Sequence, residues 1–165
     1  MDADRIVAKA QACEMDAAAN VRAFLEAIRA CEGTTGPDGY RTLFGGGLFS
    51  GWGDHPRKRF TFVNTAGQTQ ITTAAGAYQF IVPTWDRLAL KLGLHDFTPD
   101  SQDRAAVELI AEAGALPDVK EGRLQAAIDK CSAVWASLPS STYPQPKRTF
   151  AFASNAYELA GGQIA

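Results

Sequence analysis

The residue with the strongest chemical potential in this sequence is Glu32, a glutamate at the end of an apolar helical pattern. The pattern consists of residues that recur at helical spacing: Val21, Phe24, Leu25, Ile28 and Cys31. At about 100° per residue, Glu32 falls inside this apolar stripe. Burial and the C-terminal end of a helix both raise a carboxyl pKa towards that of a general acid. The same pattern also fits a surface glutamate on a frayed last turn.

The expected helix around this glutamate has a start signal and a stop signal. Asn20 is a good N-cap, because its side-chain oxygen can accept a free backbone N–H of the first turn. Gly33 suits the left-handed conformation that ends a helix. Together they predict a helix over residues 20–32 with Glu32 as its last residue.

Tyr78 and Gln79 form a second candidate for chemistry. They follow the small-residue run 73–77, which lets a backbone come close to a ligand. The glutamine amide can both donate and accept hydrogen bonds, as a hydroxyl or N-acetyl group requires. The glycine-rich segment 35–53, with its four aromatic residues, could supply a sugar-stacking wall. It fits equally well as turns that hold a few core aromatics.

The remaining elements describe a mainly helical protein with one small hairpin. Residues 54–58 read as a solvated charged turn, and 59–63 and 68–72 as two antiparallel strands. Helices are expected from Pro83 to Gly93 and from Thr98 to Gly114. A core helix is expected over 122–139, and a last one from about Phe150 to Gly161. This order of elements predicts an α+β fold in one domain.

Composition excludes several functional classes. The 165 residues carry a net charge of −2, so nothing draws the whole molecule to nucleic acid or an anionic membrane. No membrane span or signal peptide is apparent. Cys13, Cys31 and Cys131, with only two histidines, form no zinc pattern, and we expect no cofactor. Buried, reduced thiols are the favoured interpretation, although one pair could bridge.

Several motifs together resemble the lambda-type family of phage endolysins. They occur in the family's order: Cys-Glu-Gly-Thr at 31–34, Gly-Gly-Gly-Leu-Phe at 45–49, Asp-His-Pro-Arg-Lys at 54–58, Ala-Ala-Gly-Ala-Tyr-Gln-Phe at 74–80, Leu-Gly-Leu-His-Asp-Phe-Thr-Pro-Asp-Ser-Gln-Asp at 92–103, Gly-Ala-Leu-Pro at 114–117 and Asp-Lys-Cys-Ser-Ala-Val-Trp-Ala-Ser-Leu-Pro at 129–139. The similarity runs from about Val21 to the last helix. It implies a lysozyme-like α+β fold, in which a small β lobe and a helical lobe enclose a peptidoglycan-binding cleft. Residues 20–165 would be the catalytic domain and residues 1–19 a helical N-terminal extension.

The resemblance also implies an activity and its residues. The family's lytic transglycosylases cleave the bond between N-acetylmuramic acid and N-acetylglucosamine and leave 1,6-anhydro ends. The catalytic glutamate falls on Glu32, and the substrate-binding positions fall on Tyr78, Gln79 and Tyr143. Cys31 replaces the family's serine. The implied partner is the glycan strand of peptidoglycan, reached in the periplasm after synthesis in the host cytoplasm and release. We expect a monomer without nucleic-acid or membrane partners.

The number of carboxylates bears on the mechanism. An ordinary glycosidase uses two, whereas a transglycosylase can use one glutamate twice. A hydrolytic phage muramidase usually carries an aspartate nine residues after its glutamate, and that position is Arg41 here. Asp38 and Asp54 remain candidate second carboxylates. A hydrolytic muramidase is therefore the alternative, and a carbohydrate-binding protein without catalysis is a third possibility.

Overall fold

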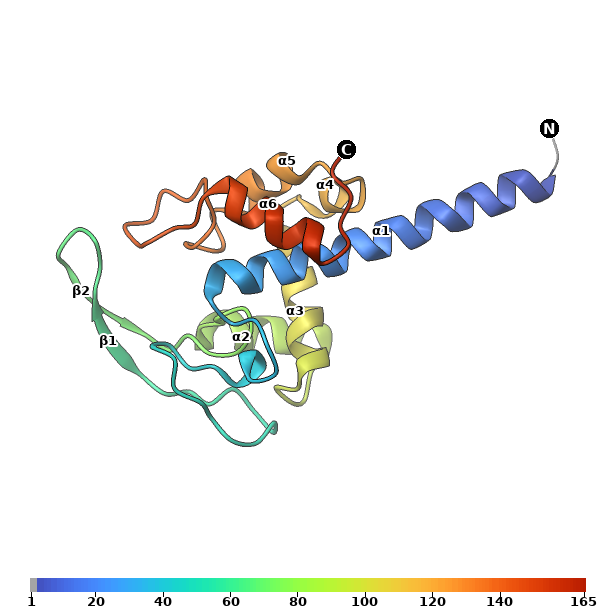
Figure 1. Cartoon of the computed structure of the whole chain (residues 1–165). Helices are drawn as coiled ribbons and strands as arrows, with labels where there is room; N and C mark the ends of the chain where they lie inside the picture. Colours follow the sequence, from blue (N-terminus) through green and yellow to red (C-terminus); the bar gives the residue numbers. More distant parts are fainter. Residues whose placement is uncertain (1–2) are drawn as a thin grey trace.

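A computed structural model, which describes residues 3–165, has the expected α+β architecture with a helical lobe beside a small β lobe (Figure 1). The elements in chain order are α1 (Ala3–Glu32), the 3₁₀ turn η1 (Gly39–Arg41), β1 (Phe60–Val63), β2 (Thr69–Thr72), α2 (Val82–Leu92), α3 (Pro99–Glu112), α4 (Leu116–Lys120), α5 (Leu124–Cys131) and α6 (Phe150–Leu159). Among the described residues, no helix combines the length and the apolar character needed to cross a membrane.

The C-terminal half of α1 is the structural centre of the protein. Phe24 and Ile28 are at most 1% exposed, and this part of α1 packs against α3, α4 and α6. Burying such a side chain contributes about 1.5–3 kcal/mol each. The apolar stripe that predicted this helix is therefore the stripe that joins it to the helical lobe, and its last residue is Glu32, as predicted.

The prediction that Asn20 caps the helix was wrong. The helix begins at Ala3, because the alanine-rich residues before Asn20 have high helix propensity and continue it towards the N-terminus. Asn20 is instead a buried mid-helix residue, 4% exposed. Its amide donates to the carbonyl oxygen of Lys120 at 3.2 Å and accepts from the backbone N–H of Gln163 at 2.8 Å. It thus ties α4 and the C-terminal segment to α1.

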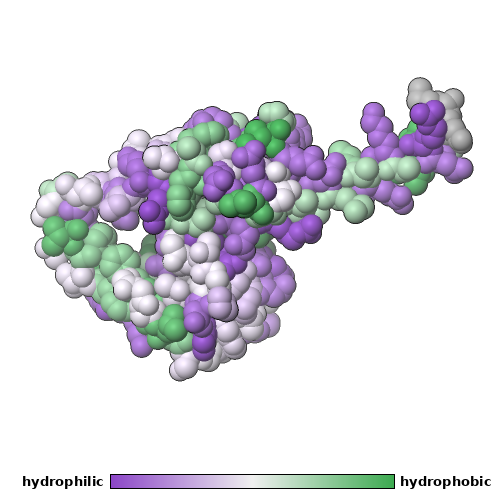
Figure 2. All heavy atoms as spheres, in the orientation of Figure 1, coloured by the Kyte–Doolittle hydropathy of each residue, from purple (hydrophilic) through white to green (hydrophobic). Residues whose placement is uncertain are grey.

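The N-terminal extension is helical over residues 3–19 and continues directly into the buried part of α1. Residues 3–16 are all exposed, and the helix projects from the body of the molecule (Figure 2). The boundary at residue 19 between this extension and the catalytic domain stays a prediction.

Removal of the extension tests that prediction. Deleting residues 2–18 should leave the fold and its melting temperature nearly unchanged, because residues 3–16 bury nothing and Asn20 keeps its two partners. Thermal unfolding, monitored by circular dichroism, measures the melting temperature. The truncated chain should also keep most of its activity on peptidoglycan. A truncated protein that folds but has no activity would assign residues 2–18 a role in the site.

The β lobe contains the predicted hairpin and one unexpected anchor. β1 pairs antiparallel with β2, with Phe60 opposite Thr72. The expectation of a merely solvated turn at 54–58 was wrong for His55, which is 2% exposed. Its Nε2 lies 2.8 Å from the carbonyl oxygen of Phe80, and its Nδ1 accepts the backbone N–H of Arg57 at 3.0 Å. Burial lowers the pKa of His55, so it stays neutral and fastens this loop to residue 80.

The helical lobe confirms three predicted helices, α2, α3 and α6, and corrects a fourth. Thr98 caps α3, and Gly93 ends α2 in the left-handed conformation. The helix expected over 122–139 was wrong in length, since α5 ends at Cys131 and the short helix α4 precedes it. Trp135 and Leu138 are buried nonetheless, in the irregular turns that follow α5. Apolar periodicity alone does not distinguish such turns from a helix.

Candidate active site

Glu32 occupies the position that its pattern predicts. It is the last residue of α1, and Gly33 follows with φ of 73°, a left-handed value that turns the chain away. The hydroxyl of Ser137 donates to its carboxyl oxygen Oε1 at 2.6 Å. Burial raises the pKa of the Glu32 carboxyl, and the Ser137 hydrogen bond opposes this rise. Glu32 is therefore suited to hold a proton that it can donate.

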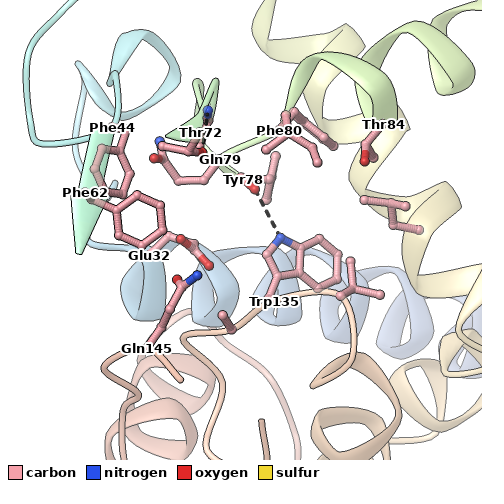
Figure 3. Close-up of a pocket in the computed structure, with 15 residues that line it drawn as sticks. Glu32, Phe44, Phe62, Thr72, Tyr78, Gln79, Phe80, Thr84, Trp135 and Gln145 are labelled. Atoms are coloured by element: carbon pink, nitrogen blue, oxygen red, sulfur yellow. Dashed lines mark hydrogen bonds between the residues drawn. The ribbon is translucent and has the colours of Figure 1, made fainter. Parts of the chain in front are cut away.

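The carboxyl faces a hollow of about 230 Å³ between the two lobes (Figure 3). Its walls come from α1, the loop that carries Phe44, the hairpin, the 74–81 segment, α2, α3 and the segment after α5. Phe44 and Phe62 form an aromatic wall, with ring centroids 5.1 Å apart. The hollow thus combines an acid with aromatic faces, an arrangement that can hold a sugar ring next to a proton donor.

Gln79 reaches this hollow from a tight turn. Its φ of 49° is a left-handed value, unusual for a residue with a side chain. The amide nitrogen donates to the carbonyl oxygens of Gly76 at 2.9 Å and Thr42 at 3.3 Å. Because both donors are directed at backbone, the side-chain oxygen is the group left to accept a hydrogen bond from a ligand.

Tyr78 lines the hollow, but its hydroxyl points elsewhere. The side chain is 2% exposed, and the hydroxyl donates to Asp103 Oδ1 at 2.6 Å. Burial, followed by the nearby Asp103 carboxylate, raises the pKa of Tyr78 well above its usual value. Its backbone oxygen accepts the indole N–H of Trp135 at 3.1 Å. Tyr78 therefore supports the wall from behind.

Gln102 of α3 holds the turn that carries Gln79. This side chain is fully buried, and its oxygen accepts the backbone N–H of Ala77 at 2.9 Å. Its nitrogen donates to the carbonyl oxygens of Tyr40 at 3.0 Å and Phe97 at 2.8 Å. Three segments that are distant in sequence thus meet at one amide.

The segment after Glu32 is held by Arg29 and Thr34. The Arg29 guanidinium donates to the carbonyl oxygens of Thr34 at 3.2 Å and Gly36 at 3.1 Å, and it lies 4.4 Å above the Tyr40 ring. The Thr34 hydroxyl lies 2.5 Å from the Ala77 carbonyl oxygen. These contacts join the turn after the acid to the turn that carries Gln79.

The cysteines are free in the structure, Cys31 and Cys131 buried and Cys13 exposed. The prediction of burial for the first two is confirmed. Burial, then the Glu32 carboxylate, raises the pKa of Cys31 to about 11, and burial raises that of Cys131 to about 12. Both thiols therefore stay protonated near neutral pH and react slowly.

Three other candidates lie away from the hollow. The hydroxyl of Tyr143 donates to the carbonyl oxygen of Ala133 at 3.0 Å. Glu32 also lines a second hollow, together with Ser137, and Tyr143 lines neither of the two. Asp38 pairs with Arg41 at 2.9 Å, and Asp54 pairs with Arg57 at 2.7 Å. Neither aspartate lines these hollows, so Glu32 is their single carboxyl within residues 3–165.

Two residues of the site were missed by the sequence analysis. Ser137 belongs to a motif quoted above, and Gln145 lies two residues after Tyr143. Figure 3 shows the amide of Gln145 directed towards the Glu32 carboxyl. No periodicity marks either residue, because both reach the site from irregular chain. Over residues 3–165, no group of histidine, cysteine and acidic side chains is arranged to hold a metal ion.

Comparisons with known proteins identify relatives of this chain. A family model described as Endolysin matches residues 22–164. The endolysin of Escherichia phage lambda is 39% identical over 149 residues, which cover 87% of this chain and 92% of that protein. The endolysin of Escherichia phage P2 is 36% identical over 157 residues, with 87% and 93% coverage.

Solved structures show the same relationship. A structure of bacteriophage lambda lysozyme complexed with a chitohexasaccharide superposes with a TM-score of 0.81 at 38% identity, over 89% of this chain and 97% of that one. A second structure of the phage lambda lysozyme gives a TM-score of 0.76 at 37% identity, with the same coverage. On sequence and structure alike, this chain belongs to the endolysin family and has the lysozyme-like fold.

Proposed function

We propose that this endolysin is a lytic transglycosylase that cleaves the β-1,4 bond between N-acetylmuramic acid and N-acetylglucosamine in peptidoglycan. The product would carry a 1,6-anhydro-N-acetylmuramic acid end. The enzyme would be made in the host cytoplasm and act on the cell wall in the periplasm after release, which leads to lysis. The observation that carries the proposal is that Glu32, with its raised pKa, is the single carboxyl lining its hollows within residues 3–165.

One carboxyl is sufficient for this reaction. Protonated Glu32 donates its proton to the glycosidic oxygen while the bond between that oxygen and C1 breaks. The resulting carboxylate then takes the proton of the muramic acid 6-hydroxyl as O6 bonds to C1. Glu32 ends protonated, and no water is consumed. The attack gains from the high effective molarity of an intramolecular nucleophile.

The walls of the hollow fit a glycan. Phe44 and Phe62 offer aromatic faces, and Gln79 offers an acceptor oxygen to a hydroxyl or N-acetyl N–H group. The related phage lambda lysozyme has been solved with a chitohexasaccharide bound, which supports a glycan as the ligand of this cleft as well.

Digestion of peptidoglycan in oxygen-18 water tests the mechanism. A transglycosylase should give unlabelled anhydro ends, one water lighter than the hydrolysed product, as measured by mass spectrometry. A hydrolytic muramidase, the alternative on this fold, would place oxygen-18 on C1 of each new reducing end. Labelled reducing ends as the main product would overturn the proposed mechanism. The assignment of peptidoglycan as the substrate would still hold.

Gln79→Ala tests the role of the cleft wall. We expect a lower kcat/KM on peptidoglycan. The decrease should correspond to a loss of about 1–3 kcal/mol of transition-state stabilisation, the cost of leaving a polar partner unpaired. Two hydrogen bonds to the backbone of Thr42 and Gly76 are also lost, so a modest decrease in melting temperature is expected.

Gln79→Gly is the matched variant, because glycine adopts the φ of 49° without strain. Both variants should lose activity to a similar extent if the side chain contacts the substrate. An unchanged rate in either variant would remove Gln79 from the binding site. A rate that recovers in Gln79→Gly alone would assign the loss in Gln79→Ala to backbone strain.

A further inference from the structure

Glu32 also lines the second hollow, which adjoins the first. It has a volume of about 300 Å³ and is lined by Cys31, Glu32, Ser137, Gln145, Lys147 and Arg148, among others. It shares Glu32, Ala136 and Gln145 with the hollow described above, so the two meet at the acid. The first has aromatic and amide walls, whereas the second has a basic wall.

The two cations of this wall have no acidic partner. Neither Lys147 nor Arg148 forms an ion pair with a carboxylate within residues 3–165. The Lys147 ammonium donates to the carbonyl oxygen of Ser141, and the Arg148 guanidinium lies 5.0 Å from the Phe152 ring centroid. Their positive charge is therefore available to an anionic ligand.

The backbone fixes this basic wall relative to the acid. The N–H of Arg148 donates to the carbonyl oxygen of Ser137 at 2.8 Å, and the Ser137 hydroxyl donates to Glu32 at 2.6 Å. The charge of Arg148 also acts on the thiol of Cys31, which precedes Glu32. A substrate whose bond is cleaved at Glu32 would thus place neighbouring groups near these cations.

We propose that Lys147 and Arg148 bind the carboxylates of the peptide stem carried by the muramic acid that is cleaved. The inference rests on the proposed function, because that reaction places C1 and O6 of a muramic acid at Glu32. The lactyl group, which carries the peptide, is attached to C3 of the same sugar ring. The sugars of the strand are uncharged, so the stem supplies the anionic groups of the substrate. The aromatic hollow then holds the glycan, and the basic hollow selects glycans that carry stems.

The test compares glycan strands with and without their stems. The double variant Lys147→Gln with Arg148→Gln should lose about 3–10-fold in kcat/KM on stem-bearing peptidoglycan, since exposed ion pairs contribute little individually. On strands from which an amidase has removed the stems, and whose freed lactyl carboxylates are then converted to neutral amides, the variant should match the wild type. The wild-type preference for stem-bearing strands should also shrink as salt is raised.

Lys58→Gln with Arg59→Gln is the matched control. This adjacent basic pair lies in the β lobe and lines neither hollow at Glu32. It removes the same charge, so it should leave the ratio of the two rates unchanged. A third substrate, with stem carboxylates converted to neutral amides, separates charge from size and should behave like the stem-free strands.

Equal losses on stem-bearing and stem-free strands would overturn the proposal and assign the pair a positioning role. No loss on either substrate would also overturn it. Failure of the proposed function is a different result, since the wild-type enzyme would then give no anhydro product from any strand.

Discussion

Glu32→Gln is expected to abolish lysis and to make the folded protein more heat-resistant at neutral pH. Glutamine keeps the size of the side chain and can still accept the Ser137 hydrogen bond, but it can neither donate nor take the proton. General acid–base catalysis contributes about 10²–10⁴-fold, and this reaction would use the group twice. The rate of anhydro-end formation should therefore fall by at least about 10³-fold.

The stability gain follows from the raised pKa of Glu32. Burial makes the folded state hold this proton more tightly than the unfolded state does. The resulting stability is fully present below the unfolded pKa of the carboxyl, and it is lost as pH rises through the higher folded pKa. A glutamine is neutral at every pH and escapes that loss. The melting temperatures of the two proteins should therefore converge in acid and separate towards neutral pH.

Thermal unfolding at a series of pH values, together with a cell-wall lysis assay, measures both effects. Glu158→Gln on the exposed surface of α6 is the control and should change neither quantity. Full lytic activity in Glu32→Gln would remove this residue from the catalytic site. An inactive variant that melts lower at neutral pH would show that the ionised carboxylate stabilises the fold.

The position of Glu32 at the end of its helix could be predicted from sequence because its signal is local. An apolar stripe, the glutamate inside it and the glycine after it lie within 13 residues, and the structure keeps all three relations. The hairpin was predictable for the same reason, since its alternating strands and turn are adjacent in the chain. Propensity and periodicity describe such short stretches well.

The partners of the acid could not be predicted in this way. Ser137 lies 105 residues from Glu32 in the chain, and no spacing rule connects them. Tyr78 shows a related difficulty: resemblance assigns it to the cleft, but only the structure reveals that its hydroxyl turns to Asp103. Tyr143 is only two residues from Gln145 in the chain, yet its hydroxyl donates to the carbonyl oxygen of Ala133. Gln145, and not Tyr143, lines the hollow. Side-chain direction depends on packing that a single sequence does not display.

Gln102→Ala should cause a large loss of stability for a single substitution. The substitution leaves the N–H of Ala77 and the carbonyl oxygens of Tyr40 and Phe97 without their partner, in a position where the side chain is fully buried. Each buried polar group left unpaired costs about 1–3 kcal/mol, and the emptied volume adds to this. Partial entry of water offsets some of the cost, so we expect a loss of about 3–5 kcal/mol.

Chemical denaturation measures the free energy of unfolding, with Gln125→Ala as the control. Gln125 is an exposed glutamine of α5 whose amide bonds only the neighbouring Asp129, so its removal should change stability by at most about 0.5 kcal/mol. A stability change in Gln102→Ala as small as in the control would mean that the 40, 77 and 97 segments hold together without this amide.

The same variant also connects the fold to the reaction. Gln102 lines neither hollow at Glu32, but it fixes Ala77, two residues before Gln79. Measured well below its melting temperature, Gln102→Ala should therefore lose activity on peptidoglycan even while it is folded. Gln102→Glu sharpens the assignment, because an ionised carboxylate can accept from Ala77 but repels the carbonyl oxygens of Tyr40 and Phe97. That variant should be least stable at high pH and recover in acid, where the protonated carboxyl can donate one hydrogen bond again.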